Sequence, residues 1–144
     1  MSIFVVDASV GVKWFVPEVH SAEARQWRNG PDKLHAPAFF FDLEIANILW
    51  KKVRRAEITR ADADMILGQV PALPLTRHPE PPLLTSAFDL ADRTQRTVYD
   101  CLYLALAVHL SGRMVTADLR LYNSLTGTPW AGFICWVGDL PAVP

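Results

Sequence analysis

The run IFVV, residues 3–6, constrains the fold of this chain more than any other feature. All four residues are apolar, whereas a strand with one solvated face would be apolar only at every second position. Unbroken apolar strands are typical of parallel sheets that carry helices on both faces. The run ends directly at Asp7, a carboxylate that is costly to bury. The sequence thus predicts a buried strand that terminates at a polar site.

Segments that favour strands and helices alternate along the rest of the chain. Further strands are expected in KLHAP, PALPL, RMVTAD and GFICWV. Helices are expected over residues 9–15, 21–30, 37–55, 58–70, 81–95, 97–112 and 119–125. This alternation predicts an α/β fold, a three-layer α/β/α sandwich with a parallel sheet of four or five strands. With 144 residues, we expect one compact domain over residues 1–144.

Composition excludes several classes of protein. The net charge of −1 gives no global sign of a nucleic-acid partner. Charged residues interrupt every apolar run before it reaches the ~20 residues of a membrane span. No basic region precedes the first apolar run, and Asp7 interrupts that run too early for a secretory signal. We therefore expect a cytoplasmic protein with no membrane association, and free thiols at both cysteines.

Four acidic residues stand beside apolar segments. Asp7 ends the first strand, Asp118 ends the strand MVTAD, Asp100 lies in the first turn of the most apolar helix, and Glu44 lies inside FFFDLEIANILW. Ligands of open α/β sheets bind beyond the carboxyl ends of the strands, where Asp7 and Asp118 are expected to point. The start of the helix that carries Asp100 borders the same edge.

Each acid also has a purely structural interpretation. Asp7 and Asp118 are in positions suited to helix N-caps, and Asp100 completes the pattern of a capping box, TVYD. Glu44 is compatible with a solvated helix position.

The four acids together point to a divalent cation. Carboxylates gathered at one edge repel each other and lose hydration, so a structural role alone gives little reason to collect them. Mg²⁺ or Mn²⁺ prefers oxygen ligands and makes a bound water a better nucleophile near neutral pH. Ser9 and Thr116, each two residues from an aspartate, offer hydroxyls that can hold a carboxylate or a water. They are equally compatible with ordinary turn and strand positions.

The segments VVDASV, LEIANIL, TVYDCLYLALA and VTADLRLY, in this order, resemble the motif series of PIN-domain ribonucleases. The short single-domain length resembles the VapC toxins of bacterial toxin–antitoxin pairs, and the resemblance extends over essentially the whole chain. It implies a catalytic quartet of Asp7, Glu44, Asp100 and Asp118, with the three aspartates as ligands of Mg²⁺ or Mn²⁺.

The same resemblance implies a toxin that cleaves RNA endonucleolytically. A metal-activated water attacks the phosphodiester and leaves a 5′-phosphate and a 3′-hydroxyl. Ser9 and Thr116 match the supporting hydroxyl positions of the family. Some relatives carry a further acid where this chain has Leu121, so one metal is favoured over two. The alternatives are a catalytically silent PIN-like protein-binding module and a stand-alone RNA-processing nuclease.

Basic residues near the motifs are candidates for contacts with RNA phosphates. These are Lys13, Lys51, Lys52, Arg54, Arg96 and Arg120. The cluster in WKKVRR is equally compatible with a solvated helix end that complements the helix dipole. The tryptophans at positions 14, 27, 50 and 130 are candidates for stacking on bases, or for the core.

The resemblance also implies two protein partners, a second copy in a homodimer and a VapB-type antitoxin that keeps the nuclease inactive. The antitoxin would lie in an apolar groove walled by the helices that begin at Ser9 and Pro37. Trp14, Phe15 and Trp50 are its candidate anchors.

Overall fold

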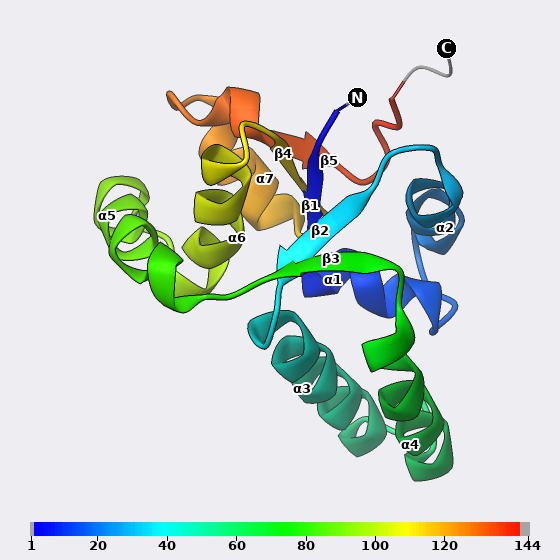
Figure 1. Ribbon diagram of the computed structural model, residues 1–144. Coiled ribbons are helices and arrows are strands. Elements are labelled where there is room, and N and C mark those ends of the chain that lie inside the picture. The colour runs from blue at the N-terminus through cyan, green and yellow to red at the C-terminus, as the bar shows by residue number, and fades with distance from the viewer. Residues whose placement is uncertain (1, 142–144) are drawn as a thin grey trace.

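The computed structural model describes residues 2–141 and contains a five-stranded parallel sheet in the order β3-β2-β1-β4-β5 (Figure 1). The strands are β1 Phe4–Val6, β2 Leu34–Pro37, β3 Leu75–His78, β4 Arg113–Thr116 and β5 Ile134–Trp136. The prediction of an α/β fold with a parallel sheet is confirmed. The strand that begins the chain is the middle one of the sheet, as its unbroken apolar sequence requires.

Seven α-helices cover the two faces of the sheet (Figure 1). They are α1 Ala8–Gly11, α2 Ser21–Asn29, α3 Phe40–Arg54, α4 Arg60–Gln69, α5 Leu84–Thr94, α6 Val98–His109 and α7 Leu119–Thr126. Helices α1 to α4 lie on one side, and α5 to α7 lie on the other, with α6 against β1 and β2. Among residues 2–141, no helix is both long enough and apolar enough to cross a bilayer.

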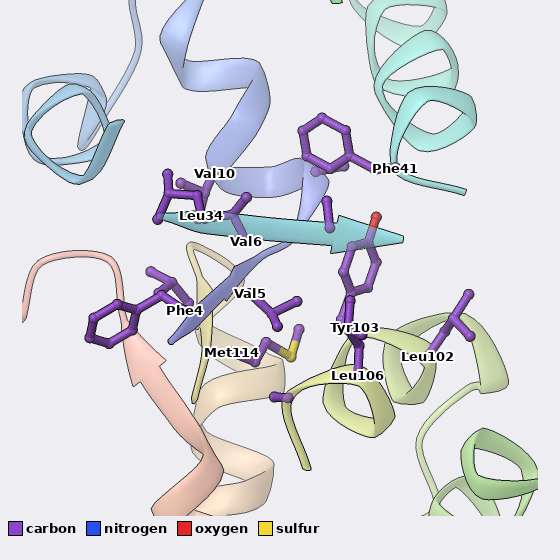
Figure 2. Packing of buried hydrophobic residues seen from close by; sticks show 14 of the residues in the cluster. Phe4, Val5, Val6, Val10, Leu34, Phe41, Leu102, Tyr103, Leu106 and Met114 are labelled. Atoms are coloured by element: carbon purple, nitrogen blue, oxygen red, sulfur yellow. The ribbon is translucent and has the colours of Figure 1, made fainter. Parts of the chain in front are cut away.

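The core confirms that both faces of β1 are buried. Figure 2 shows Val5 directed toward Met114 and the helix α6, while Val6 lies on the side of Val10. Val5 and Val6 are both fully buried. The apolar residues of the central strand therefore join the two layers of helices, and Asp7 follows where this packing ends.

Several element boundaries differ from the sequence prediction, and two of them lie in neighbouring elements at the carboxyl end of β2. The strand expected in PALPL starts only at Leu75 and runs through His78, because residues 70–72 form a 3-10 helix that extends α4. The helix expected from Pro37 begins at Phe40, and Pro37 is instead the last residue of β2, paired with His78. The Glu80 carboxylate accepts hydrogen bonds from the backbone N–H groups of residues 39 and 40, which fixes where α3 starts.

Candidate active site

The structure brings the four predicted acids together at the carboxyl end of the sheet. Asp7 follows β1, Asp118 follows β4, Asp100 lies in the first turn of α6, and Glu44 lies on α3. The charge on Asp100 raises the pKa of Asp7 and of Glu44, and the charge on Asp118 raises the pKa of Asp100. These four residues, from four separate segments, form one electrostatic unit that we call the acidic cluster.

Asp7 is the most deeply buried acid of the cluster, with 6% of its surface exposed. The Ser9 hydroxyl donates to Asp7 Oδ1 at 2.5 Å, and the Thr116 hydroxyl donates to Oδ2 at 2.5 Å. The N–H of Val10 donates to Oδ1 at 3.2 Å, so Asp7 also caps α1. Burial outweighs these hydrogen bonds and raises the pKa of Asp7 to about 6. The capping role and the site role therefore coexist in one residue.

The two hydroxyls beside Asp7 also bind the end of β4. Ser9 Oγ accepts a hydrogen bond from the N–H of Ala117 at 3.0 Å, and Thr116 Oγ1 accepts one from the N–H of Asp118 at 3.1 Å. These bonds tie the loop that carries Asp118 to the carboxylate of Asp7. The prediction that both hydroxyls lie beside the acids agrees with this geometry.

Glu44 is held by a residue for which the sequence predicted no role. The Tyr103 hydroxyl donates to Glu44 Oε1 at 2.5 Å. Figure 2 shows the Tyr103 side chain rising from α6 across the end of β2. Burial raises the pKa of Glu44 to about 7, and the charges of Asp7 and Asp100 add to this shift. Burial and the neighbouring Glu44 raise the pKa of Tyr103 well above its ordinary value, so its hydroxyl remains a proton donor.

A signal for Tyr103 was nevertheless present in the sequence. It lies three residues after Asp100, a spacing that places both side chains on one face of a helix. One helix, α6, thus supplies an acid of the cluster and the hydroxyl that holds a second acid.

Asp100 is the acid of the cluster that faces a cation. Its N–H donates to the Thr97 hydroxyl at 3.1 Å, which caps α6 as the sequence predicted. Arg96 Nη2 lies 3.5 Å from Asp100 Oδ2. Burial raises the pKa of Asp100, and Arg96 opposes that shift. Arg96 Nε is buried and has no hydrogen-bond partner within the described part of the chain.

Asp118 is exposed and caps α7. Its Oδ1 accepts hydrogen bonds from the N–H groups of Arg120 at 3.1 Å and Leu121 at 3.2 Å. The Leu121 side chain is buried in the core, where it offers no ligand atom.

The donor chemistry of the acidic cluster fits Mg²⁺ or Mn²⁺, because hard divalent cations prefer carboxylate oxygens. Burial raises the pKa values of three of the acids, the charges of neighbouring acids add to these shifts, and a bound cation would favour the ionised forms. Within residues 2–141, no three acidic, histidine or cysteine side chains already stand in an arrangement that would hold an ion.

The predicted RNA-binding residues fall into two groups. Lys13 and Lys52 both bind Glu18, with Nζ–Oε distances of 2.9 Å and 2.6 Å, and their side chains are only 12% and 15% exposed. They fasten the segment after α1 to α3. Lys51 and Arg54 are exposed on α3, and the charge of Lys51 lowers the pKa of Glu44. Exposed Arg120 and half-buried Arg96 lie next to the acidic cluster.

The four tryptophans that were candidates for stacking on bases differ in their exposure. Trp14 and Trp27 are buried in the core, which removes them from any binding surface and removes Trp14 as an antitoxin anchor. Trp130 is half-buried, and Trp50 is exposed on α3 with the Arg54 guanidinium 5.0 Å from its ring centre.

Comparison with known proteins places this site in a family. A family model of the PIN domain matches residues 4–124. Ribonuclease VapC3 of Pyrobaculum aerophilum is 36% identical over 124 residues, which cover 81% of this chain and 90% of the relative. Ribonuclease VapC12 of Mycobacterium tuberculosis is 32% identical over 123 residues, covering 85% of this chain and 92% of that protein.

Solved structures have the same fold. The crystal structure of PAE2754 from Pyrobaculum aerophilum superposes with a TM-score of 0.69 at 25% identity, covering 95% of this chain and 85% of the other. VapC20 of Mycobacterium tuberculosis, a toxin that cleaves the sarcin–ricin loop, gives a TM-score of 0.61 at 16% identity, covering 81% and 88%. At that identity, the second likeness concerns the fold alone.

Proposed function

The chain belongs to the PIN-domain family, among the VapC ribonucleases, and we propose that it is a Mg²⁺- or Mn²⁺-dependent endoribonuclease that serves as the toxin of a toxin–antitoxin pair. The supporting observation is the acidic cluster, in which the buried Asp7 and Glu44 have pKa values of about 6 and about 7. A fold that needed only a structural core would not gather such charges at one edge.

In this proposal Asp7, Asp100 and Asp118 hold the ion. When bound, the ion supplies a nucleophilic water near neutral pH and stabilises charge on the phosphate. Ser9 and Thr116 fix the two oxygens of Asp7, and Tyr103 fixes Oε1 of Glu44.

Glu44 is suited to receive the proton of the attacking water. Its Oε1 is occupied by the Tyr103 hydroxyl, so Oε2 is the atom that takes the proton. A carboxylate in this position is a suitable general base. Attack at phosphorus then breaks the bond to the 3′ oxygen and leaves a 3′-hydroxyl and a 5′-phosphate.

The proposed partners use exposed apolar surfaces. Phe39, which directly precedes α3, and Leu84 and Phe88 on α5 are exposed apolar residues that offer contacts to a second copy of the chain. The antitoxin would use the cavity of about 390 Å³ between α3 and α4, which Trp50 and Leu67 line. We expect the pair to act in the cytoplasm, where the RNA is found.

Cleavage of a pooled small-RNA preparation by antitoxin-free protein tests this function. Fragments with 5′-phosphates should form with Mg²⁺ or Mn²⁺ and should be absent in EDTA. Asp7→Asn and Asp100→Asn should abolish them, whereas Asp89→Asn, at an exposed acid that pairs with Arg93 on α5, should leave cleavage unchanged. Cleavage that survives EDTA or either cluster substitution would contradict the proposal.

A further inference from the structure

A pair of stacked aromatic rings lies beside the acidic cluster. Phe40 on α3 and Tyr99 at the start of α6 have ring centroids 5.4 Å apart and planes inclined by only 12°. Tyr99 is 64% exposed although it directly precedes Asp100. Phe40 lies one helical turn before Glu44. We call this pair the aromatic shelf.

The aromatic shelf forms one side of a cavity of about 370 Å³. The cavity is lined by Phe40, Leu43, Glu44, Asn47 and Tyr99. It therefore combines flat apolar surface, one amide and one acid of the cluster. A ligand in this cavity lies in contact with Glu44, so the same molecule also reaches the acidic cluster.

We propose that the aromatic shelf and its cavity bind one unpaired nucleobase of the RNA, with the base stacked on Tyr99. The inference rests on the proposed nuclease function and deepens it, because it assigns residues that position the RNA beside the acids. Proteins recognise unpaired bases by stacking them on aromatic side chains and by hydrogen bonds to their edges. Tyr99 offers the ring face, and the exposed Asn47 offers an amide that both donates and accepts.

Charge along α3 supports RNA as the occupant. Lys51 follows Asn47 by one helical turn and is exposed, so a phosphate beyond the bound base meets a cation. A second copy of the chain seated on the aromatic shelf would instead cover Glu44 and exclude RNA from the acids. Phe39, Leu84 and Phe88 are exposed apolar residues outside the lining of this cavity.

Fluorescence anisotropy with short labelled oligonucleotides tests this inference. The probes are a ten-nucleotide oligoadenylate and an abasic strand with the same phosphates, both in Ca²⁺, with gels to verify that the RNA stays intact. Tyr99→Ala should weaken oligoadenylate binding by about tenfold, since one stacked base contributes about 1–3 kcal/mol. Binding of the abasic strand should stay unchanged. Tyr99→Phe, which keeps the ring, should bind both probes as the wild type does.

Three outcomes would overturn the inference. In the first, Tyr99→Ala binds oligoadenylate as tightly as the wild type. In the second, its affinity for both probes falls equally, which indicates an electrostatic or folding effect. In the third, sedimentation shows that Tyr99→Ala dissociates a dimer, which assigns the aromatic shelf to a second copy. Cleavage of pooled RNA by the wild type is scored separately, so a failed nucleobase site and a failed nuclease assignment remain distinguishable.

Discussion

The acidic cluster has two halves that differ in how the protein accommodates the negative charges. Asp7 and Glu44 lie in buried or half-buried positions, where side-chain hydroxyls donate to them and their pKa values are about 6 and about 7. Asp100 and Asp118 lie at the starts of α6 and α7, where backbone N–H groups and the helix dipole favour an acid. Asp118 is stable as an ordinary helix start, whereas burial makes the ionised forms of Asp7, Glu44 and Asp100 cost folding free energy.

This difference explains how a single residue meets two requirements. Where a strand ends and a helix begins, an acid can cap the helix. A metal site at the same place needs that acid to be accessible to an ion. Asp118 caps α7 and is exposed, so it is open to the proposed ion. Asp7 caps α1 and is buried, and Ser9 and Thr116 hold its two oxygens.

The largest effects are expected from substitutions that separate the two halves. Asp7→Asn and Asp118→Ala should each reduce cleavage at least about a hundredfold, because each removes a proposed metal ligand. Their effects on stability without metal should have opposite signs. At pH 8 Asp7→Asn should raise the free energy of unfolding by about 1–3 kcal/mol, since a pKa raised by about two units opposes folding of the ionised form by roughly that amount.

Asp118→Ala should instead lower the free energy of unfolding by about 1 kcal/mol through the loss of the α7 cap. Urea denaturation in EDTA measures both values. The contrast between the halves fails if both substitutions destabilise the protein equally.

The next effect concerns pH and metal together. The pKa values of Asp7 and Glu44 are higher in the folded chain than in the unfolded chain, so the folded state holds more protons between pH 4 and pH 7. Stability without metal should therefore fall as pH rises through this range, and the melting temperature should drop by about 5–10 °C between pH 5 and pH 8. Saturating Mn²⁺ should restore much of this loss at pH 8.

Differential scanning calorimetry in EDTA and in Mn²⁺ checks this dependence. A double variant, Asp7→Asn with Glu44→Gln, serves as the control, because its curve reports only the other titrating groups. Those include His35 and His78, whose pKa values are lowered by burial and which therefore oppose the trend. A wild-type curve that parallels the control would show that the buried acids are not the cause.

The sequence predicted the four acids of the cluster, because each follows or interrupts an apolar segment at a topologically defined point. It could not predict which atoms hold them. The Tyr103–Glu44 bond joins residues 59 positions apart, and the Glu18–Lys52 bond joins residues 34 positions apart. Such pairs follow from how distant segments pack together in the folded chain, which local patterns do not contain.

For the fold too, local patterns predicted some features, and contacts between distant segments decided the rest. Unbroken apolar runs identified the central strands, because such strands are buried whichever strands pair with them. The edge strand β3 was misplaced by a few residues, since Thr76, Arg77 and His78 are polar and their pairing with β2 decides the register. The start of α3 depended on Glu80, about 40 residues away in the chain.

A smaller effect is expected from removing the Tyr103 hydroxyl, which donates a hydrogen bond to Glu44. Tyr103→Phe removes the donor to Glu44 Oε1 and should lower the cleavage rate about tenfold, because Glu44, the proposed proton acceptor, loses the group that orients it. Mn²⁺ affinity, measured by isothermal titration, should stay unchanged, since Glu44 is not among the proposed ligands. Tyr122→Phe, on α7, is the matched control for hydroxyl loss. Cleavage at the wild-type rate in Tyr103→Phe would remove Tyr103 from the site.

The smallest effect distinguishes two roles of Arg96, which lies beside Asp100 near the start of α6. If Arg96 mainly favours the ionised form of Asp100, Arg96→Gln raises the pKa of that acid further. Cleavage should then fall more at acidic pH than at alkaline pH, because a higher pKa leaves less of Asp100 ionised in acid. If Arg96 instead binds an RNA phosphate, the loss should be the same at both pH values and should shrink in high salt. Initial rates at both pH values and two salt concentrations decide between them, and we expect the pH-dependent result because Arg96 Nη2 already lies 3.5 Å from Asp100.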